Sequence, residues 1–301
     1  MTQHITRAPV KTFNPPSGRA FSYCEFGAAD GHPVLAFHGT PGSRLKYEVA
    51  HEAATGLGLR LLSIDRWGYG GTPAPPRDDV SLHGFGQDMR ALIQSLGKSQ
   101  ASIVGISGGG PYAMATAAVL KGKASKLALV APVAPLVGAN AVSSAVADMR
   151  MFHKLAFFGV PKVPGLSRVA FGALRSVLKV NGPAAMRLVT ARAGPSDRVI
   201  ACAPENAARL SETFRLGLEK TTRGAAIDMQ VFSSAWDVDV GDIASQTRLW
   251  IGTDDRNVPI PPAKALQTKI RKFELTELPG AGHFWITKHY ADVLGWLASK
   301  Q

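Results

Sequence analysis

The chain is poor in cysteine and has no long apolar segment. Its 301 residues include two cysteines, Cys24 and Cys202, with no CxxC pair and no Cys/His spacing of a zinc site. We therefore expect no disulfide framework and no metal, and interpret both cysteines as small buried hydrophobic residues. No run reaches the roughly 18 uncharged apolar residues of a membrane-spanning helix. The first 16 residues also lack the apolar stretch of a signal peptide. The expected location is the cytoplasm, without stable membrane insertion.

Acidic residues are scarce as well. The chain has 22 Asp and Glu against 34 Lys and Arg, which gives a net charge of +12. A basic balance can indicate nucleic-acid binding, but no nucleic-acid motif accompanies it, and we do not expect that partner. The excess is concentrated between Asp148 and Arg198, where Asp148 and Asp197 are the acidic residues. The basic residues there are Arg150, Lys154, Lys162, Arg168, Arg175, Lys179, Arg187, Arg192 and Arg198.

Part of this basic segment has the spacing of an amphipathic helix. Arg168, Arg175 and Lys179 fall on one helical face, and an apolar side can form from Val169, Leu174, Val177 and Leu178. A solvated helix face explains the pattern. Two alternatives are attraction of an anionic substrate and attraction to an acidic membrane surface.

Apolar runs alternate with helix-compatible segments over most of the chain. Strands are predicted at residues 10–13, 20–25, 34–37, 59–65, 103–106, 126–131, 248–252 and 273–278. Helices are predicted at residues 51–56, 81–96, 111–120, 262–270 and 284–299. This alternation predicts an α/β fold with a mostly parallel sheet and helices on both faces.

The alternation is interrupted in the middle of the chain. Residues 133–242 contain no strand-like apolar run, only helix-compatible pieces separated by Gly and Pro. We interpret them as a helical insertion. The predicted organisation is therefore a core formed by residues 1–132 and 243–301, with an inserted helical segment at 133–242.

The most informative motif follows the strand at 103–106. Gly105-Ile106-Ser107-Gly108-Gly109 stands between that strand and the helix at 111–120, which is the arrangement of a nucleophile elbow. A serine at so sharp a turn needs positive φ, and its neighbours two residues away must be small. Gly105 and Gly109 meet this need.

Five motifs together resemble the α/β-hydrolase superfamily, in its proline iminopeptidase and esterase-like branch. In chain order they are His38-Gly39 after a strand, Asp65-Arg66-x-Gly-x-Gly, the elbow at Ser107, residues 252–259 and residues 280–283. The resemblance implies an α/β-hydrolase fold. It also implies that the insertion is a cap over the active site, with a pocket for a small-molecule substrate between core and cap.

A serine hydroxyl needs a neighbouring base to attack a carbonyl carbon. The chain order serine, acid, histidine matches this fold, and His283, in a Gly-rich loop after the last strand, is the predicted base. The acid is one of two adjacent residues. The usual placement in the family selects Asp255, and Asp254 remains the alternative. Either would orient the imidazole and stabilise the imidazolium.

An oxyanion needs two backbone donors beside Ser107. We predict the N–H of Gly108 and, because Pro41 has no N–H, that of Thr40, whose hydroxyl is a possible third donor. By resemblance His38 anchors this loop. Candidate pocket residues are His38, Trp67, Phe152 and Trp236. The chemistry requires no cofactor.

The predicted function is hydrolysis of a small to medium, largely apolar carboxylic ester through an acyl-enzyme on Ser107. Aminopeptidase activity is an alternative. However, Thr40 and Gly108 stand where proline iminopeptidases have a glycine and a tryptophan. The inserted segment is also basic, whereas binding of a cationic amino terminus would require acidic residues. Cofactor-free haloperoxidases, acyltransferases and carbon–carbon bond hydrolases share the triad. Epoxide hydrolases and dehalogenases resemble this chain in plan but use an aspartate nucleophile. A non-catalytic binding protein is a further alternative. Loss of a triad residue would favour it, and this sequence retains all three.

Overall fold

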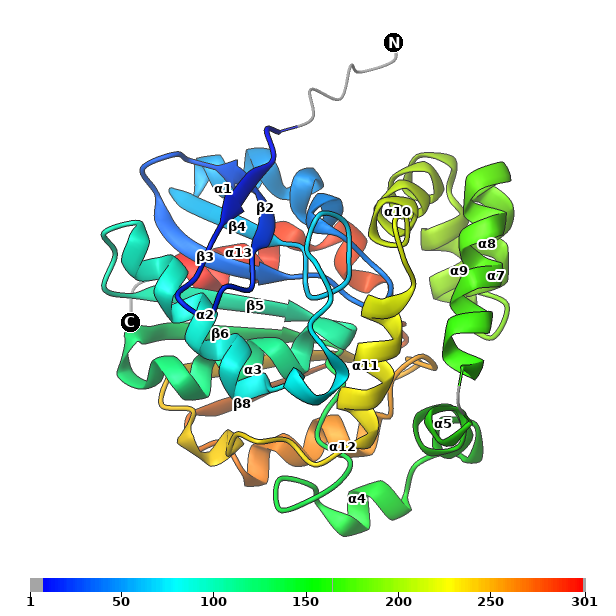
Figure 1. Cartoon of the computed structure of the whole chain (residues 1–301). Coiled ribbons are helices and arrows are strands. Elements are labelled where there is room, and N and C mark those ends of the chain that lie inside the picture. The colour runs from blue at the N-terminus through cyan, green and yellow to red at the C-terminus, as the bar shows by residue number, and fades with distance from the viewer. Residues whose placement is uncertain (1–7, 164, 300–301) are drawn as a thin grey trace.

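The computed structural model describes residues 8–163 and 165–299 and is built on one eight-stranded sheet (Figure 1). The strand order is β1-β2-β4-β3-β5-β6-β7-β8. β2 pairs antiparallel with β1 and β4, and the remaining neighbours pair parallel. The strands are β1 (Lys11–Phe13), β2 (Phe21–Gly27), β3 (His32–Phe37), β4 (Leu59–Ile64), β5 (Ala101–Ile106), β6 (Ala124–Val130), β7 (Gln246–Gly252) and β8 (Phe273–Leu278). The predicted fold class is confirmed.

Helices cover both faces of the sheet because the central strands are apolar along their length. Every residue of β5 is buried, and its neighbours Ile103 and Val104 point into different cores. The core around Ile103 is closed by α2 (Leu82–Ser95), α3 (Gly110–Leu120) and α12 (Ile260–Ala265). The core around Val104 is closed by α1 (His51–Gly56) and α13 (Tyr290–Ala298).

Two predicted helices are shorter than their periodicity suggested. The helix expected at 262–270 is α12, which ends at Ala265 and continues as the 3₁₀ turn Leu266–Thr268. The helix expected at 284–299 is divided at His289 between the 3₁₀ turn Trp285–Lys288 and α13. Apolar spacing therefore located both segments but not the change of helical type within them.

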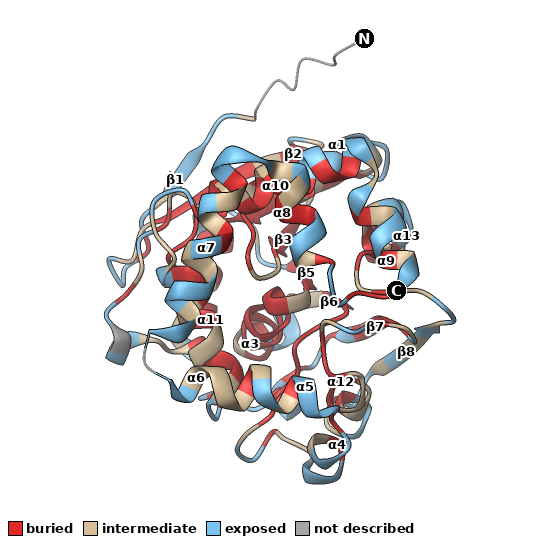
Figure 2. Cartoon of the chain, turned by 90° about the vertical axis from the view of Figure 1, so that its right-hand side faces the viewer, coloured by how far each residue is buried: buried red, intermediate tan, exposed pale blue. Residues whose placement is uncertain are grey.

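The chain between β6 and β7 is helical. Its helices are α4 (Ser143–Ala147), α5 (Met151–Lys154), α6 (Val160–Lys162), α7 (Leu166–Val180), α8 (Gly182–Val189), α9 (Pro195–Cys202), α10 (Pro204–Gly217) and α11 (Arg223–Ser233). Most of them lie to the right of the sheet in Figure 1, where they are drawn green to yellow. Figure 2 turns this part of the molecule toward the viewer. α7, α8, α9 and α10 share a small core that includes Leu178, Met186 and Phe214. Of the helices in residues 8–163 and 165–299, none combines the length and apolarity needed to cross a bilayer.

Two predictions about burial are wrong. Val169 was placed on the apolar side of α7, but its side chain is 70% exposed, and the buried residues of that helix are Leu174 and Leu178. Cys202 was expected to be buried like Cys24, yet it lies exposed at the end of α9. Both thiols are free. The packing of neighbouring helices, rather than residue type, decides which of these side chains meet solvent.

Candidate active site

Ser107 lies at a sharp turn between β5 and α3. Its φ is +53°, in the left-handed region, and its side chain is half-buried at the carboxyl end of the strand. Strand and helix come so close here that a Cβ on Gly105 would lie 2.5 Å from the Cβ of Ala113. The same Cβ would lie 2.9 Å from the carbonyl oxygen of Gly109. Glycine at 105 therefore permits the turn that presents the serine.

The side chains of Ser107, His283 and Asp255 form one hydrogen-bonded chain. His283 lies in the loop after β8 and Asp255 in the loop after β7. The Nε2 of His283 is 3.0 Å from Ser107 Oγ, and its Nδ1 is 2.8 Å from Asp255 Oδ2. Because a neutral imidazole donates from Nδ1 to the carboxylate, Nε2 is left to accept from the serine hydroxyl. The structure brings together the residues predicted as nucleophile, base and acid.

The structure also separates the two candidate acids. Asp255 is fully buried, and its Oδ1 accepts hydrogen bonds from the backbone N–H groups of Asn257 and Val258. The Asp254 side chain does not contact the imidazole. Its Oδ1 accepts from Nη2 of Arg256 at 3.1 Å and from Nε of the same residue at 3.2 Å. Asp255 is therefore the carboxylate that contacts the imidazole.

The pKa of His283 is raised above its ordinary value. Burial favours the neutral imidazole and acts to lower this pKa, but the charge of Asp255 and its hydrogen bond outweigh that effect. Asp197 adds a second negative charge, and the positive charge of Lys46 opposes it. A raised pKa makes the imidazole a stronger base toward the Ser107 hydroxyl.

Thr40 and Gly108 lie against each other beside Ser107. A Cβ on Gly108 would be 2.9 Å from the Cβ of Thr40, and a Cβ on Gly39 would be 3.2 Å from that of Ser107. Gly108 belongs to the first turn of a helical segment, where backbone N–H groups have no intrahelical acceptor. Within the described ranges, no acceptor is found for the N–H of Thr40. Both groups are thus available to an oxygen bound at the serine.

A buried carboxylate from the inserted segment fixes the Thr40 loop. Asp228 of α11 is 1% exposed and forms an ion pair with Arg66, which is fully buried. It also accepts hydrogen bonds from the hydroxyls of Tyr69 at 2.6 Å, Tyr112 at 2.8 Å and Thr40. The Thr40 hydroxyl is therefore occupied by Asp228, and the possibility that it supplies a third oxyanion donor is wrong.

His38 supports the same loop from inside the core. Its Nδ1 donates to the Gly39 carbonyl at 2.8 Å, and its Nε2 accepts from the Arg66 N–H at 3.2 Å. Burial, together with the charge of Arg66, holds the pKa of His38 well below its usual value, so the ring is neutral. Its side chain has no solvent-exposed surface, and the expectation that it lines the substrate pocket is wrong. Asp65 pairs with Arg44 and accepts from the N–H of Gly71, so it ties two neighbouring loops together.

A second buried carboxylate from the inserted segment binds the histidine loop. Asp197 of α9 is fully buried and accepts from the N–H of His283 at 2.9 Å and from that of Phe284 at 2.7 Å. A Cβ on Gly282 would collide with this carboxylate, so the loop approaches α9 closely only because residue 282 is glycine. Burial raises the pKa of Asp197, and the two backbone hydrogen bonds act against that rise.

The remaining predicted pocket residues lie in different surroundings. Trp67 is 1% exposed, inside an aromatic cluster with Phe21, Phe85 and Tyr112, so its assignment to the pocket is wrong. Phe152 is 41% exposed, and the Arg192 guanidinium lies 4.2 Å from its ring centroid.

Trp236 is buried, and its Nε1 donates to the carbonyl oxygen of Val231. The aromatic ring beside the elbow is instead that of Phe232, because a Cβ on Gly108 would lie 2.9 Å from its Cζ. The ring of Phe157 packs against Phe232, with centroids 5.8 Å apart.

Sequence reasoning did not identify three polar residues near the site, namely Asp197, Asp228 and His153. The Nε2 of His153, on α5, lies 3.0 Å from the carbonyl oxygen of Arg256, beside the acid. Asp197 had one detectable signal, since it is an isolated acid in a strongly basic segment. Asp228 and His153 had none, because each stands in a helix where a polar residue is ordinarily solvated.

Comparison with protein families gives one model that matches residues 34–295, described as the alpha/beta hydrolase family. Two curated proteins share a shorter segment with this chain. Bifunctional epoxide hydrolase 2 of Sus scrofa is 34% identical over 94 residues, which is 31% of this chain and 17% of that protein. Epoxide hydrolase 3 of Xenopus tropicalis is 33% identical over 98 residues, or 32% of this chain and 26% of that protein. The similarity thus spans about a quarter or less of these relatives.

Solved structures resemble the chain over nearly its whole length. Epoxide hydrolase VrEH1 from Vigna radiata has a TM-score of 0.74 at 18% identity, with 97% of each chain covered. An alpha/beta hydrolase fold protein from Nakamurella multipartita has a TM-score of 0.69 at 23% identity, covering 96% of this chain and 98% of its own. The esterase EaEST from Exiguobacterium antarcticum has a TM-score of 0.66 at 19% identity, covering 96% and 99%. At these identities the likeness establishes the fold.

Proposed function

Because the chain belongs to the alpha/beta hydrolase family, we propose that it is a serine hydrolase acting on small to medium, largely apolar carboxylic esters. The observation that supports this most directly is the hydrogen-bonded chain from Ser107 through His283 to Asp255. A hydroxyl that donates to a neutral imidazole, itself oriented by a buried carboxylate, is the arrangement that activates a serine toward a carbonyl carbon.

The proposed reaction has two halves. Ser107 Oγ attacks the ester carbonyl carbon while Nε2 of His283 takes its proton, and the resulting oxyanion accepts from the N–H groups of Gly108 and Thr40. His283 then gives the proton to the departing alcohol, which leaves an acyl group on Ser107. Water attacks this acyl group as the imidazole takes one proton, and the carboxylic acid and free serine are released. Asp255 stays ionised throughout and stabilises the imidazolium.

We further propose that residues 133–242 act as a cap that helps to position the catalytic loops. Asp197 binds the backbone on either side of the His283 side chain, and Asp228 binds Thr40 and Arg66. Each carboxylate is buried, so each contact is made in a region of low dielectric where it holds a loop strongly. In this proposal Asp197 and Asp228 are positioning residues.

The nucleophile favours an ester over an epoxide. The curated relatives are named epoxide hydrolases. Epoxide hydrolases that resemble this chain in plan use an aspartate nucleophile, whereas this chain has Ser107 at the elbow. An ester presents a planar carbonyl carbon whose oxygen develops charge in the transition state. The paired N–H groups of Gly108 and Thr40 suit that charge.

The test is a substrate panel with the full chain. We expect hydrolysis of p-nitrophenyl acetate and butyrate, no hydrolysis of styrene oxide, and slow or absent cleavage of amino-acyl p-nitroanilides. Ser107→Ala should reduce ester turnover by at least about 10³-fold. Ser144→Ala, at an exposed serine of α4, is the matched control and should be unaffected.

Mass spectrometry of the enzyme quenched during turnover should locate an added acyl group on the Ser107 peptide. Equal ester rates for the native chain and Ser107→Ala would refute the assignment of the nucleophile. Faster opening of styrene oxide than of any ester would refute the substrate class.

A further inference from the structure

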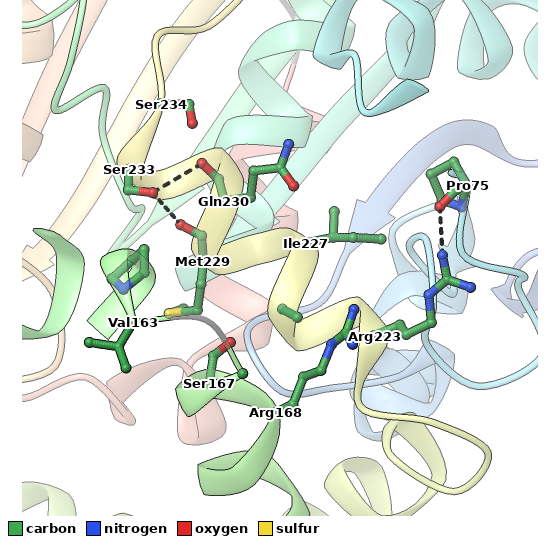
Figure 3. Close-up of a pocket in the computed structure, with 13 residues that line it drawn as sticks. Pro75, Val163, Ser167, Arg168, Arg223, Ile227, Met229, Gln230, Ser233 and Ser234 are labelled. Atoms are coloured by element: carbon green, nitrogen blue, oxygen red, sulfur yellow. Dashed lines mark hydrogen bonds between the residues drawn. The ribbon is translucent and has the colours of Figure 1, made fainter. Parts of the chain in front are cut away.

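We propose that a cavity between α7 and α11 is a binding site for an amphipathic carboxylate, separate from the active site (Figure 3). The cavity has a volume of about 330 Å³, within the usual range for small-ligand sites. Ser107, His283 and Asp255 are not among the residues that line it. The residues that line it include Val163, Ser167, Arg168, Arg223, Ile227 and Met229.

Two guanidinium groups lie at this cavity, and neither forms an ion pair with a carboxylate in the part of the chain that the structure describes. Arg168 reaches from α7 toward α11, and Arg223 stands at the first turn of α11 (Figure 3). Arg223 donates only to the backbone oxygen of Pro75 through its side chain, and no partner is found for Arg168 within residues 8–163 and 165–299. None of the described residues that line the cavity is acidic. The electrostatic potential of the cavity therefore favours an anion.

The first turn of α7 adds to this positive potential. α7 spans 15 residues, begins after Gly165, and has neither a side-chain cap nor an acidic residue in its first turn. Gly165, Ser167 and Arg168 of this turn line the cavity, so the positive end of the helix dipole faces the same space as the two guanidinium groups. A carboxylate placed there can accept hydrogen bonds from Arg168 and from the Ser167 hydroxyl.

Part of the lining is apolar and suits a short alkyl chain. Val163, Ile227 and Met229 contribute aliphatic or thioether side chains, next to Pro161. An ion without an apolar portion would leave these groups in contact with water, whereas an alkyl carboxylate would cover them. The combination of charged and apolar walls identifies the ligand class as a carboxylate with a hydrocarbon tail.

The cavity and the active site lie on opposite faces of α11. Ala226, Gln230 and Ser233 line the cavity, while Asp228 and Phe232 face the core, where they contact Thr40 and Gly108. A bound carboxylate would therefore press on the helix that fixes the oxyanion loop without occupying the catalytic space.

Isothermal titration calorimetry of the full chain with sodium decanoate tests this site. We expect saturable binding that weakens as salt is added, since the guanidinium groups are exposed and screened. Arg168→Gln and Arg223→Gln should each weaken binding by about tenfold or more. Arg187→Gln, at an exposed cap arginine outside the cavity, is the matched control and should bind as the native chain does.

Arg168→Lys keeps the charge and should retain most of the affinity, which separates loss of the site from misfolding. The proposal is overturned if decanoate does not bind, if neutral decanamide binds equally well, or if both glutamine variants bind like the native chain. The last result would place decanoate elsewhere, for example at Ser107. Because the titration measures binding alone, its result is independent of ester hydrolysis.

Discussion

Asp197 accepts a hydrogen bond from the backbone N–H of His283 at 2.9 Å, although one residue belongs to the inserted helices and the other to the sheet domain. The other oxygen of the carboxylate accepts from Phe284, and Gly282 lacks the Cβ that would block the approach. The loop that presents the imidazole is therefore attached to α9. This attachment predicts that a charge on α9 influences the titration of a residue more than 80 positions away.

Replacing Asp197 by Asn removes a negative charge beside His283. The pKa of the imidazole should fall, because the imidazolium loses a stabilising neighbour. Activity requires the neutral ring, so the acidic limb of the kcat/KM profile for p-nitrophenyl butyrate should move to lower pH. A role of Asp197 limited to folding would instead reduce the rate at all pH values and leave the limb in place.

Lys46→Gln provides the opposite shift. The positive charge of Lys46 lowers the pKa of His283, and burial lowers the pKa of Lys46 itself to about 8, so Lys46 carries its charge below that pH. Removing that charge should raise the pKa of His283 and move the acidic limb to higher pH. Shifts of the same sign in Asp197→Asn and Lys46→Gln would contradict the electrostatic account.

Asp255→Asn should reduce kcat strongly, by about 10⁴-fold if the acid acts as in other serine triads. An amide at this position can no longer fix the imidazole with its proton on Nδ1. Asp254→Asn is the matched control, because the Asp254 carboxylate contacts Arg256 and not the imidazole. Its kcat should stay within a few-fold of the native value. A larger loss in Asp254→Asn than in Asp255→Asn would reverse the assignment of the acid.

Asp228→Asn should destabilise the fold by about 3–5 kcal/mol, because it leaves the fully buried guanidinium of Arg66 without a counter-charge. The free energy of unfolding from urea titration measures this. Glu274→Gln removes the carboxylate of a surface pair with Arg248, in which Glu274 is 56% exposed, and should cost about 0–1 kcal/mol. Similar losses in both variants would show that burial of the Arg66 pair has no energetic consequence.

The left-handed backbone of Ser107 predicts a difference in stability between two variants that lack its hydroxyl. Ser107→Ala keeps a Cβ at φ +53°, whereas Ser107→Gly removes it. The glycine variant should therefore be more stable than the alanine variant, by about 1 kcal/mol. Urea unfolding of the two proteins at the same pH checks this. Equal free energies would mean that the elbow conformation costs nothing at this position.

Much of the fold could be predicted because its signals are local. Strand β5 is an apolar run with Gly105 near its end and Ser107 directly after it, and this pattern alone predicts a buried strand that ends in an elbow. Asp255 and His283 follow other strands of the same sheet. Because carboxyl ends of parallel strands meet at one edge, their order along the chain already predicted that they could approach the serine.

The environments of the inserted helices were not predictable in this way. Asp197 and Asp228 occur in helices where an acid is usually solvated, yet both are buried against loops of the core. Val169 belongs to an apolar pattern, yet it faces solvent. Helical periodicity assigns side chains to faces but does not state which face is covered, since that depends on the docking of one helix on another.

Trp67 and His38 illustrate the same limit inside the core. Their residue types suit a substrate pocket, and both follow strands that lead toward the site. The structure buries Trp67 among Phe21 and Phe85, and it uses both ring nitrogens of His38 in backbone hydrogen bonds. A large aromatic residue at a strand end can turn into the core or into a pocket, and nothing within its own segment decides between the two.

The sequence by itself determined the strand order along the chain, the helical character of residues 133–242 and the elbow at Ser107, because each depends on neighbouring residues. The family resemblance already favoured Asp255 over Asp254, whereas tertiary structure alone decided that Asp197 and Asp228 bind the loops that carry His283 and Thr40. These contacts join residues far apart in the chain, and they form only when the inserted helices pack against the sheet. Long-range packing, unlike local conformation, leaves no pattern in any single stretch of sequence.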